Sequence, residues 1–377
     1  MAKAIYAFSG DPITYGHLDI IRRAAQVFDQ LVVAIGLNPD KKYLFTLEER
    51  TDLAEQAVSK FSNVQVVSFR GLLVDFAYEI GADVIVKGVR NPSDFEYETS
   101  LHRVGDSQEL GIDTFILIAD PKKAHISSSA VKQIQKEQGL IHEYVPLVVK
   151  QAVEKKISGQ YIVSLTGEIG AGKSYVSQQF AQLGQKQGLE VHNIELDHLT
   201  HQIYQELTEP KYHQIRDTIA QTFGQQVRQE DGTINRKVLG EIVFNDYDKL
   251  RLLNEIMEQP LMVRIRRELY GKTGLILLNA ALIIEAQMTY LSNNHICLVK
   301  TDEATQRQRL ERRDLTPVQI KRRLDSQYTF EEKKRNAQEI IEQEGFGKFW
   351  IVDNVQDATE PELEKVFKQL VVDLELV

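Results

Sequence analysis

The sequence predicts an α/β fold made of two doubly wound parallel-sheet domains. Its 377 residues are more than one typical domain of about 150 residues contains. In both halves, short apolar runs alternate with amphipathic helical stretches, which is typical of a parallel sheet covered by helices. Each half also opens with an apolar run that leads directly into a glycine-containing turn. We therefore expect a first domain at residues 1–158 and a second at residues 159–377.

In the first domain, five apolar runs predict strands at residues 4–8, 31–37, 64–69, 84–86 and 114–118. The amphipathic stretches between them predict helices at residues 18–28, 47–61, 72–80 and 95–110. Gly81 stands where a helix would end in a left-handed residue. A helix over residues 145–160, ending near Ser158 and Gly159, predicts a short linker to the second domain.

The second domain repeats this pattern with longer helical insertions. Its strands are predicted at residues 161–165, 191–196, 275–284, 295–301 and 349–352. Helices are predicted at residues 204–223 and 235–270. The stretch 305–343 is helical in pattern and rich in arginine, which suits a helical lid over bound phosphates.

Composition narrows the classes of function. The apolar fraction of 42% and the charged fraction of 26% are those of a soluble globular protein. The net charge is −9 and neither half is basic, so we expect no nucleic-acid surface. The single cysteine, Cys297, lies in an apolar run and allows neither a disulfide nor a cysteine-based zinc site. No segment reaches the ~18 apolar residues that a membrane span needs, and the first residues lack a signal-peptide pattern. We expect a cytoplasmic protein with no membrane contact.

A polar motif, D-P-I-T-Y-G-H, follows the first predicted strand. Ser9 and Asp11 stand at the carboxyl end of that strand, where ligands bind in doubly wound sheets. His17 falls at the start of the next helix, where free N–H groups and the helix dipole favour anions. One histidine at such a place is more often an ordinary surface residue. The complete motif favours a phosphate-binding role.

This motif matches the T/H-x-G-H element of nucleotidyltransferases, and residues 1–158 resemble bacterial phosphopantetheine adenylyltransferase along nearly their whole length. The resemblance is carried by that motif and by residues 38–42, 45–50, 88–90, 94–98 and 126–129. It implies catalytic roles for His17, Lys41 and Arg90. It further implies an ATP site made of Ser9, Gly10, His17, Gly88, Arg90, Glu98, Ser127, Ser128 and Ser129. The acceptor site that it implies is made of Ser9, Lys41, Leu73 and Lys87. The family's usual P-G-T-F-D-P reads A-F-S-G-D-P at residues 7–12, and the first arginine of its R-G-x-R motif is Lys87.

A second motif, G-E-I-G-A-G-K-S at residues 167–174, follows the first predicted strand of the second domain. It matches G-x-x-x-x-G-K-[ST], whose backbone N–H groups hold phosphates. In that loop, the lysine, here Lys173, binds the β- and γ-phosphates and the hydroxyl, here Ser174, binds Mg²⁺. Asp197 follows the second strand and suits either a base facing the γ-phosphate or a helix N-cap. Arg309 and Arg313 share one helix face, either as phosphate-binding cations or as a solvated charged face.

Residues 161–377 resemble dephospho-coenzyme A kinase. The matching positions include the loop glycines Gly167, Gly170 and Gly172, together with Asp231-Gly232, Arg236, Thr305-Gln306, Arg309, Arg313-Asp314 and Gln327. The resemblance implies that Lys173 and Asp197 are catalytic, that Ser174 and Asp197 serve Mg²⁺ held on the ATP phosphates, and that Arg309 and Arg313 are lid cations. It places Arg236, Pro260 and Glu285 near dephospho-CoA. The family's D-A-D reads Glu195-Leu196-Asp197 here.

Together the two resemblances imply a Rossmann-like nucleotidyltransferase followed by a P-loop kinase with a helical lid. The expected ligands are ATP with Mg²⁺, 4′-phosphopantetheine, dephospho-CoA and coenzyme A. The expected assembly is a homo-oligomer formed through the N-terminal domain. Two alternatives stay open: another adenylyltransferase–kinase fusion, of the nicotinamide mononucleotide adenylyltransferase and ribosylnicotinamide kinase type, or an adenylyltransferase with an inactive nucleotide-sensing kinase-like domain.

Overall fold

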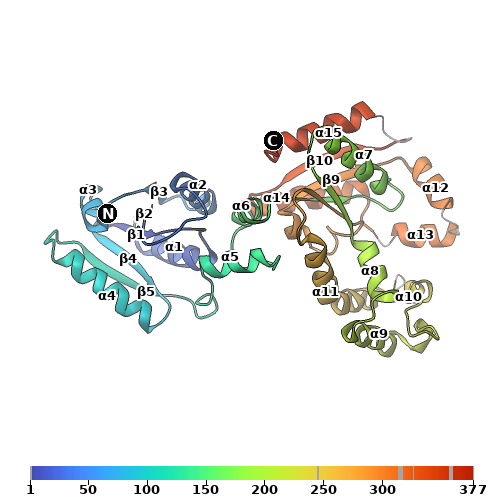
Figure 1. The fold of residues 1–377 in the computed structure, drawn as a ribbon, viewed down its shortest axis with the longest axis horizontal. Helices are drawn as coiled ribbons and strands as arrows, with labels where there is room; N and C mark the ends of the chain where they lie inside the picture. Colours follow the sequence, from blue (N-terminus) through green and yellow to red (C-terminus); the bar gives the residue numbers. More distant parts are fainter. Residues whose placement is uncertain (1, 244–245, 313–316, 326, 356–359, 377) are drawn as a thin grey trace. The chain divides into compact units, whose positions relative to one another are not determined.

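The computed structural model describes residues 2–243, 246–312, 317–325, 327–355 and 360–376. The chain divides into two compact units, Met1–Ile157 and Ser158–Val377. Each unit contains one five-stranded sheet in which all strand pairs are parallel, with helices packed against it (Figure 1). The predicted α/β class with two parallel sheets is therefore confirmed.

The first sheet has the strand order β3-β2-β1-β4-β5. Its strands are β1 (Lys3–Phe8), β2 (Gln30–Ile35), β3 (Val64–Ser68), β4 (Val84–Val89) and β5 (Asp113–Ile118). Its helices are α1 (Tyr15–Val27), α2 (Leu47–Val58), α3 (Leu73–Glu79), α4 (Pro92–Asp106), α5 (Ser128–Lys136) and α6 (Leu147–Ser158). The chain order reverses on either side of β1, so the carboxyl ends of β1 and β4 form the crevice where doubly wound sheets bind ligands.

Side chains that alternate along β1 fill cores on both faces of the first sheet. Ala4 and Tyr6 pack with α1, α2, α5 and α6, whereas Ile5 packs with α3 on the other face. Because both faces are covered, the strands are apolar nearly throughout, as parallel strands usually are. Helix α4 differs, because none of its residues is buried.

The second sheet has the strand order β10-β9-β6-β8-β7. Its strands are β6 (Gln160–Thr166), β7 (Val191–Glu195), β8 (Gly274–Asn279), β9 (His295–Lys300) and β10 (Lys348–Asp353). Its helices are α7 (Lys173–Lys186), α8 (Leu196–Gln205), α9 (Pro210–Phe223), α10 (Arg236–Val243), α11 (Tyr247–Leu269), α12 (Glu303–Glu311), α13 (Pro317–Asp325), α14 (Phe330–Glu344) and α15 (Glu360–Asp373), with short 3₁₀ turns at Gln225–Val227 and Thr289–Ser292.

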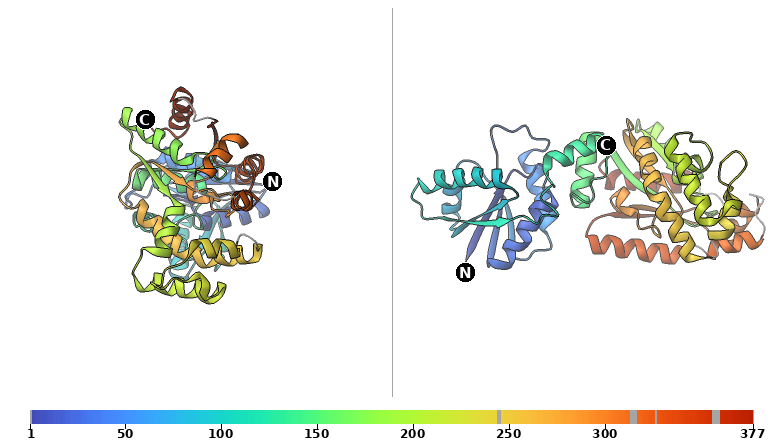
Figure 2. Two further views of the ribbon diagram at one scale, coloured as in Figure 1. Left: turned by 90° about the vertical axis from the view of Figure 1, so that its right-hand side faces the viewer. Right: turned by 90° about the horizontal axis from the view of Figure 1, so that it is seen from below.

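Among the described residues, the second unit contains separate apolar clusters on its sheet and in its helical layer. One joins β6, β8, β9 and β10 to helices α7 and α15. The other lies among α8, α9, α10 and α11, which form a helical layer of their own, coloured yellow-green to gold in Figure 2. Central strand β6 leads straight into the glycine-rich loop, so this loop lies at the middle of the sheet edge.

Within the described residues, no helix combines the length and the apolar character that crossing a membrane requires.

Three long helices predicted from the sequence are divided in the structure. The stretch 204–223 contains the last two residues of α8, which ends at Gln205, and the whole of α9, which begins at Pro210, a residue suited to the first position of a helix. The stretch 305–343 is three helices, and α14 starts anew at Thr329, whose side chain accepts a hydrogen bond from the backbone of Glu332. The stretch 235–270 contains α10 and α11, on either side of residues 244–245, which lie outside the described part of the chain.

Candidate functional sites

A cavity of about 530 Å³ opens at the carboxyl ends of β1 and β4. It is lined by eleven residues that the sequence singled out, namely Ser9, Gly10, His17, Lys41, Lys87, Gly88, Arg90, Glu98, Ser127, Ser128 and Ser129. These come from five separate stretches of the chain, which the fold brings together. Leu73 is not among the lining residues and packs instead beneath β1 with the α3 core.

His17 is held as a neutral hydrogen-bond donor in the first turn of α1. The backbone N–H of Thr14 donates to Nδ1 at 3.1 Å, which leaves Nε2 to carry the proton. The ring stacks on Phe8 with centroids 4.4 Å apart. Burial, together with nearby Arg90 and Lys41, lowers the pKa of His17 to about 4. The imidazole is therefore uncharged near neutral pH and presents one N–H group.

Cationic side chains surround this donor. Arg90 makes a two-pronged contact with Asp94, with Nε at 2.7 Å and Nη2 at 3.2 Å from the two carboxylate oxygens. Lys87 pairs with Glu98 at 2.8 Å, so the structure joins a residue expected at the acceptor to one expected at the nucleotide. Lys123 also lines the cavity, and the sequence reasoning missed it because it lies in a loop with no motif.

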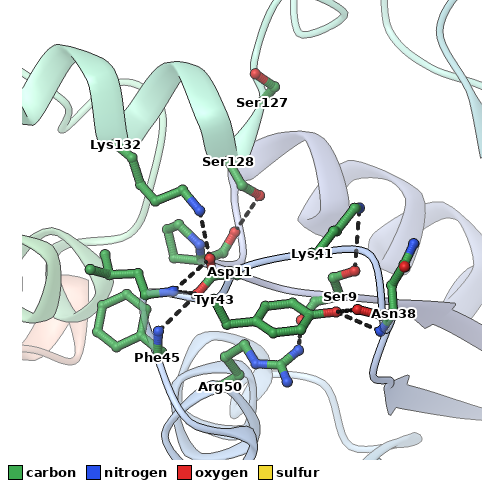
Figure 3. A network of polar contacts seen from close by, with 12 residues as sticks. Ser9, Asp11, Asn38, Lys41, Tyr43, Phe45, Arg50, Ser127, Ser128 and Lys132 are labelled. Atoms are coloured by element: carbon green, nitrogen blue, oxygen red, sulfur yellow. Dashed lines mark hydrogen bonds and ion pairs between the residues drawn. The ribbon is translucent and has the colours of Figure 1, made fainter.

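The floor of the cavity needs a residue without a side chain at position 88. A Cβ atom on Gly88 would lie 2.9 Å from Ile20 Cγ1, closer than packed carbons approach. On the opposite side, Ser127 caps helix α5 by accepting a hydrogen bond from the backbone of Ala130 at 3.1 Å. The hydroxyl of Ser128 donates to the carbonyl of Pro12 at 2.8 Å (Figure 3). The N-terminus of α5 is thereby fixed against the D-P-I-T-Y-G-H motif.

In the second unit, the loop 167–174 connects β6 to α7. Three of its glycines, Gly167, Gly170 and Gly172, have positive φ angles. A Cβ atom on Gly172 would come within 2.2 Å of Asn354 Nδ2, so only glycine fits there. Lys173 Nζ donates to the carbonyl of Gly167 at 3.1 Å and to that of Glu168 at 3.3 Å. The lysine thus lies over the loop that would hold phosphates.

The carboxylate that faces Ser174 belongs to Glu195. Ser174 Oγ donates to Glu195 Oε1 at 3.3 Å, and Asn193 Nδ2 donates to the same oxygen at 3.1 Å. Asp197, two residues later, is exposed in the first turn of α8. A serine hydroxyl beside a carboxylate is a set of hard oxygen donors that fits Mg²⁺. The sequence reasoning passed over Glu195, although its place in the motif at residues 195–197 was a usable signal.

Arg309 supports the loop from α12. Its guanidinium donates to the carbonyls of Gly170 and Ala171, at 3.2 and 3.0 Å, and to that of Asn354 at 3.1 Å. Gln306, one turn earlier, donates to the carbonyl of Ile169 at 2.9 Å. Arg309 therefore lies at the loop and donates to backbone carbonyls of the loop and of Asn354. Arg313, its expected partner, lies outside the described residues.

Glu285 lies in a second polar cluster beside the loop. It accepts the backbone N–H of Tyr328 at 3.0 Å and pairs with the fully buried Lys333, whose Nζ also donates to the carbonyl of Ala281 at 2.7 Å. Burial lowers the pKa of Lys333, and the nearby Glu285 opposes that shift. Burial also raises the pKa of Glu168 in the loop.

The two remaining acceptor-side residues belong to the helical layer. Arg236 is exposed at the start of α10, where Nη1 lies 3.3 Å from His201 Nδ1. Pro260 is buried inside α11. The structure therefore gathers Lys173, Ser174 and Arg309 at one loop, and places Arg236 and Pro260 on α10 and α11.

Comparisons with known proteins match these two units to two families. Residues 161–347 match the family model "Dephospho-CoA kinase", and residues 9–134 match the model "Cytidylyltransferase-like". Two relatives, both described as phosphopantetheine adenylyltransferase, come from Clostridium perfringens and Clostridium kluyveri. The first is 43% identical over 168 residues, which cover 45% of this chain and 99% of the relative. The second is 47% identical over 161 residues, which cover 43% of this chain and 98% of the relative.

A solved structure described as dephospho-CoA kinase from Campylobacter jejuni covers 57% of this chain and 97% of its own, with 18% identity and a TM-score of 0.31. The family models and the two clostridial relatives, by contrast, cover both units. The chain therefore belongs to the phosphopantetheine adenylyltransferase family through its N-terminal part and joins to it a dephospho-CoA kinase domain.

Proposed function

We propose that this chain is a bifunctional transferase that catalyses the last two steps of coenzyme A synthesis. The first unit joins ATP and 4′-phosphopantetheine to give dephospho-CoA and pyrophosphate. The second unit then uses another ATP to phosphorylate the ribose 3′-hydroxyl of dephospho-CoA. The observation that carries this proposal is the joining, in one chain, of a near-complete adenylyltransferase match and a kinase-family match, because the product of one is the substrate of the other.

The chemistry of the first reaction suits the cavity beside β1. The attacking group is a phosphate oxygen that is already an anion, so no general base is needed. Catalysis then depends on alignment and on charge stabilisation as pyrophosphate leaves. His17 offers an uncharged N–H group, Arg90 and Lys41 offer cations, and Ser9 lies 3.5 Å from the Lys41 ammonium. We assign His17 and Arg90 to the ATP phosphates, and Ser9 and Lys41 to the phosphate shared by both substrates.

The second reaction suits the glycine-rich loop. We assign Lys173 to the ATP phosphates and Ser174 with Glu195 to Mg²⁺, which supplies charge neutralisation on those phosphates when bound. Asp197 remains our candidate base for the ribose hydroxyl, since it is exposed in the first turn of α8, the helix that follows Glu195. Arg309 holds the loop carbonyls and so keeps the loop N–H groups directed toward the phosphates.

The experiment that tests this function separates it from its rivals. The purified chain should release pyrophosphate from ATP and Mg²⁺ only when 4′-phosphopantetheine is added. It should then consume further ATP when dephospho-CoA is supplied. Release with nicotinamide mononucleotide instead would favour the other adenylyltransferase–kinase fusion. Pyrophosphate release without any phosphorylation of dephospho-CoA would favour a kinase-like domain that only senses nucleotide.

We also propose that the chain forms a homo-oligomer through its first unit. Helix α4 has no buried residue, and its exposed apolar side chains include Phe95, Tyr97, Leu101 and Val104. Edge strand β5 adds Phe115, Ile116 and Ile118, which is 73% exposed. Exposed apolar side chains on neighbouring elements are typical of an interface, and a second copy of this chain is the occupant we propose. A cytoplasmic location is proposed with it, in keeping with the free thiol of Cys297.

A further inference from the structure

The loop that carries Lys41, residues 38–45, is closed on itself (Figure 3). The backbone N–H of Asn38 donates to Tyr43 Oη at 2.6 Å, and the Tyr43 hydroxyl donates back to the carbonyl of Asn38 at 3.3 Å. The backbone N–H of Lys41 donates to the same carbonyl at 3.1 Å. These internal bonds tie the two ends of the Lys41 loop to each other. The position of the Lys41 ammonium therefore depends on what fixes the base of the loop.

Asp11 fixes that base. Its Oδ1 accepts the N–H groups of Leu44 and Phe45, both at 3.0 Å, and its Oδ2 lies 3.1 Å from the N–H of Leu44. Only 5% of Asp11 is exposed, and it is not among the residues that line the cavity. Its contacts therefore support the protein backbone, two residues away from Ser9.

Lys132 completes the support from another element. Its ammonium lies 2.5 Å from Asp11 Oδ2, and it projects from α5, whose first residues line the cavity (Figure 3). A buried carboxylate without a partner is costly, so this cation stabilises the charge that the Lys41 loop needs. The same pair joins helix α5, whose first residues lie on the nucleotide side, to the base of the Lys41 loop on the acceptor side.

Arg50 contacts the Lys41 loop at Tyr43, away from the Asp11 carboxylate. It is fully buried, and Nη1 donates to the carbonyls of Ser9 and Gly36, the latter at 2.9 Å. Its guanidinium also lies 4.0 Å from the centre of the Tyr43 ring. The closed loop is therefore held at Tyr43 by Arg50 and at Leu44 and Phe45 by Asp11.

We propose that Asp11, with its charge balanced by Lys132, is the positioning residue that sets Lys41 for the phosphate of the acceptor. This proposal rests on the proposed adenylyl transfer. Asp11 acts through Lys41 and does not touch substrate itself. Misplacing one reacting or charge-stabilising group by about 1 Å can cost on the order of 10² in rate, so a loose loop base should be costly.

A double-variant cycle in the full chain tests the proposal. Steady-state dephospho-CoA formation is measured for wild type, Asp11→Asn, Lys41→Ala and the double variant. Asp11→Asn should raise KM for 4′-phosphopantetheine by roughly tenfold and KM for ATP by less than about threefold, given the size of positioning effects. Because both changes act on one contact, the double variant should be within about twofold of Lys41→Ala alone. Losses that multiply in the double variant would overturn the proposal.

Lys132→Met provides a second route that leaves the carboxylate and its backbone hydrogen bonds in place. It should repeat the rise in acceptor KM, whereas Lys136→Met, at an exposed position in the last turn of the same helix and away from the cavity lining, should be neutral. If Asp11→Asn does not fold, the cycle is run with Lys132→Met in its place. A rise in KM for ATP alone would make Lys132 a direct phosphate ligand and overturn the proposal.

Phosphorylation of added dephospho-CoA by the second unit normalises every variant to the amount of active second unit. Thermal unfolding of the full chain, followed by circular dichroism and compared with wild type, checks that the first unit is folded. A wild-type chain that makes no dephospho-CoA would overturn the proposed function and this inference together. A wild-type chain that makes it, with multiplicative losses in the cycle, would overturn this inference alone.

Discussion

At the residue scale, one hydrogen bond determines what His17 can do. The backbone N–H of Thr14 occupies Nδ1, so the other nitrogen carries the proton, and the residue lines the cavity. The sequence predicted a donor at this helix start, since the motif and its position after β1 were both visible. It could not predict that the ring is neutral, because the low pKa of His17 depends on burial and on Arg90 and Lys41, which lie far along the chain.

His17→Ala should reduce dephospho-CoA formation by on the order of 10²–10³, since it removes one preorganised donor to a developing charge. Phosphorylation of dephospho-CoA should be unchanged. The matched control is His102→Ala on α4, where the ring contacts Thr114 and does not line the cavity. Both rates are measured on the same preparation of the full chain, and a loss below tenfold for His17→Ala would remove this residue from the site.

Glu195 and Asp197 are expected to separate into two roles at the second site. Glu195→Gln should raise the Mg²⁺ concentration needed for half-maximal kinase rate by about 10–100-fold, as loss of a supporting metal contact does. Asp197→Asn should instead lower kcat, because an amide cannot accept the proton, while ATP affinity measured by calorimetry changes little. A normal Mg²⁺ requirement in Glu195→Gln would return the metal role to Asp197.

At the element scale, the sequence predicted the strands far better than the helices. All ten strands were placed within a few residues, because each is a short apolar run between polar turns. Helix ends were missed where a proline or a capping threonine restarts a helix without breaking the apolar pattern, as at Pro210 and Thr329. Helices α5 and α15 were missed altogether, and α8 was predicted only in its last two residues. In α5, the serines 127–129 were interpreted as ligands only, although Ser127 is also the helix cap.

Helix α4 provides the prediction at this scale. Val104 is 54% exposed and does not line the cavity, so Val104→Glu should place a charge in the proposed interface and shift the full chain toward monomer. The control is Val27→Glu at the end of α1, which is 61% exposed on another element. Light scattering at matched protein concentration measures the assembly. Equal masses for wild type and Val104→Glu would show that α4 is not in the interface.

At the scale of the whole molecule, each of the two units has its own sheet, its own core and its own candidate phosphate site. The structure divides the chain between Ile157 and Ser158, one residue before the boundary expected from the sequence. Helix α6 ends at Ser158, and Gly159 follows with a positive φ angle while its carbonyl accepts the N–H of Gly274 in the second unit. The junction is therefore a helix end followed directly by a strand of the next sheet.

Cutting the chain between Ser158 and Gly159 should give two pieces that each fold, because the core of each unit is built from its own residues. Residues 1–158 should make dephospho-CoA, and residues 159–377 should convert added dephospho-CoA to coenzyme A. The two rates are compared with those of the intact chain. A second piece that is inert on dephospho-CoA but phosphorylates another nucleoside would overturn the kinase half of the proposal and leave the first half standing.

The most direct test of the central claim is mass spectrometry of the products that the intact chain forms from ATP, Mg²⁺ and 4′-phosphopantetheine alone. The account predicts coenzyme A as the final product, with dephospho-CoA appearing first and then declining. Chains with Lys173→Ala should stop at dephospho-CoA, and chains with His17→Ala should form coenzyme A only when dephospho-CoA is added. Accumulation of dephospho-CoA as the end product of the wild-type chain, or no product at all, would contradict the account.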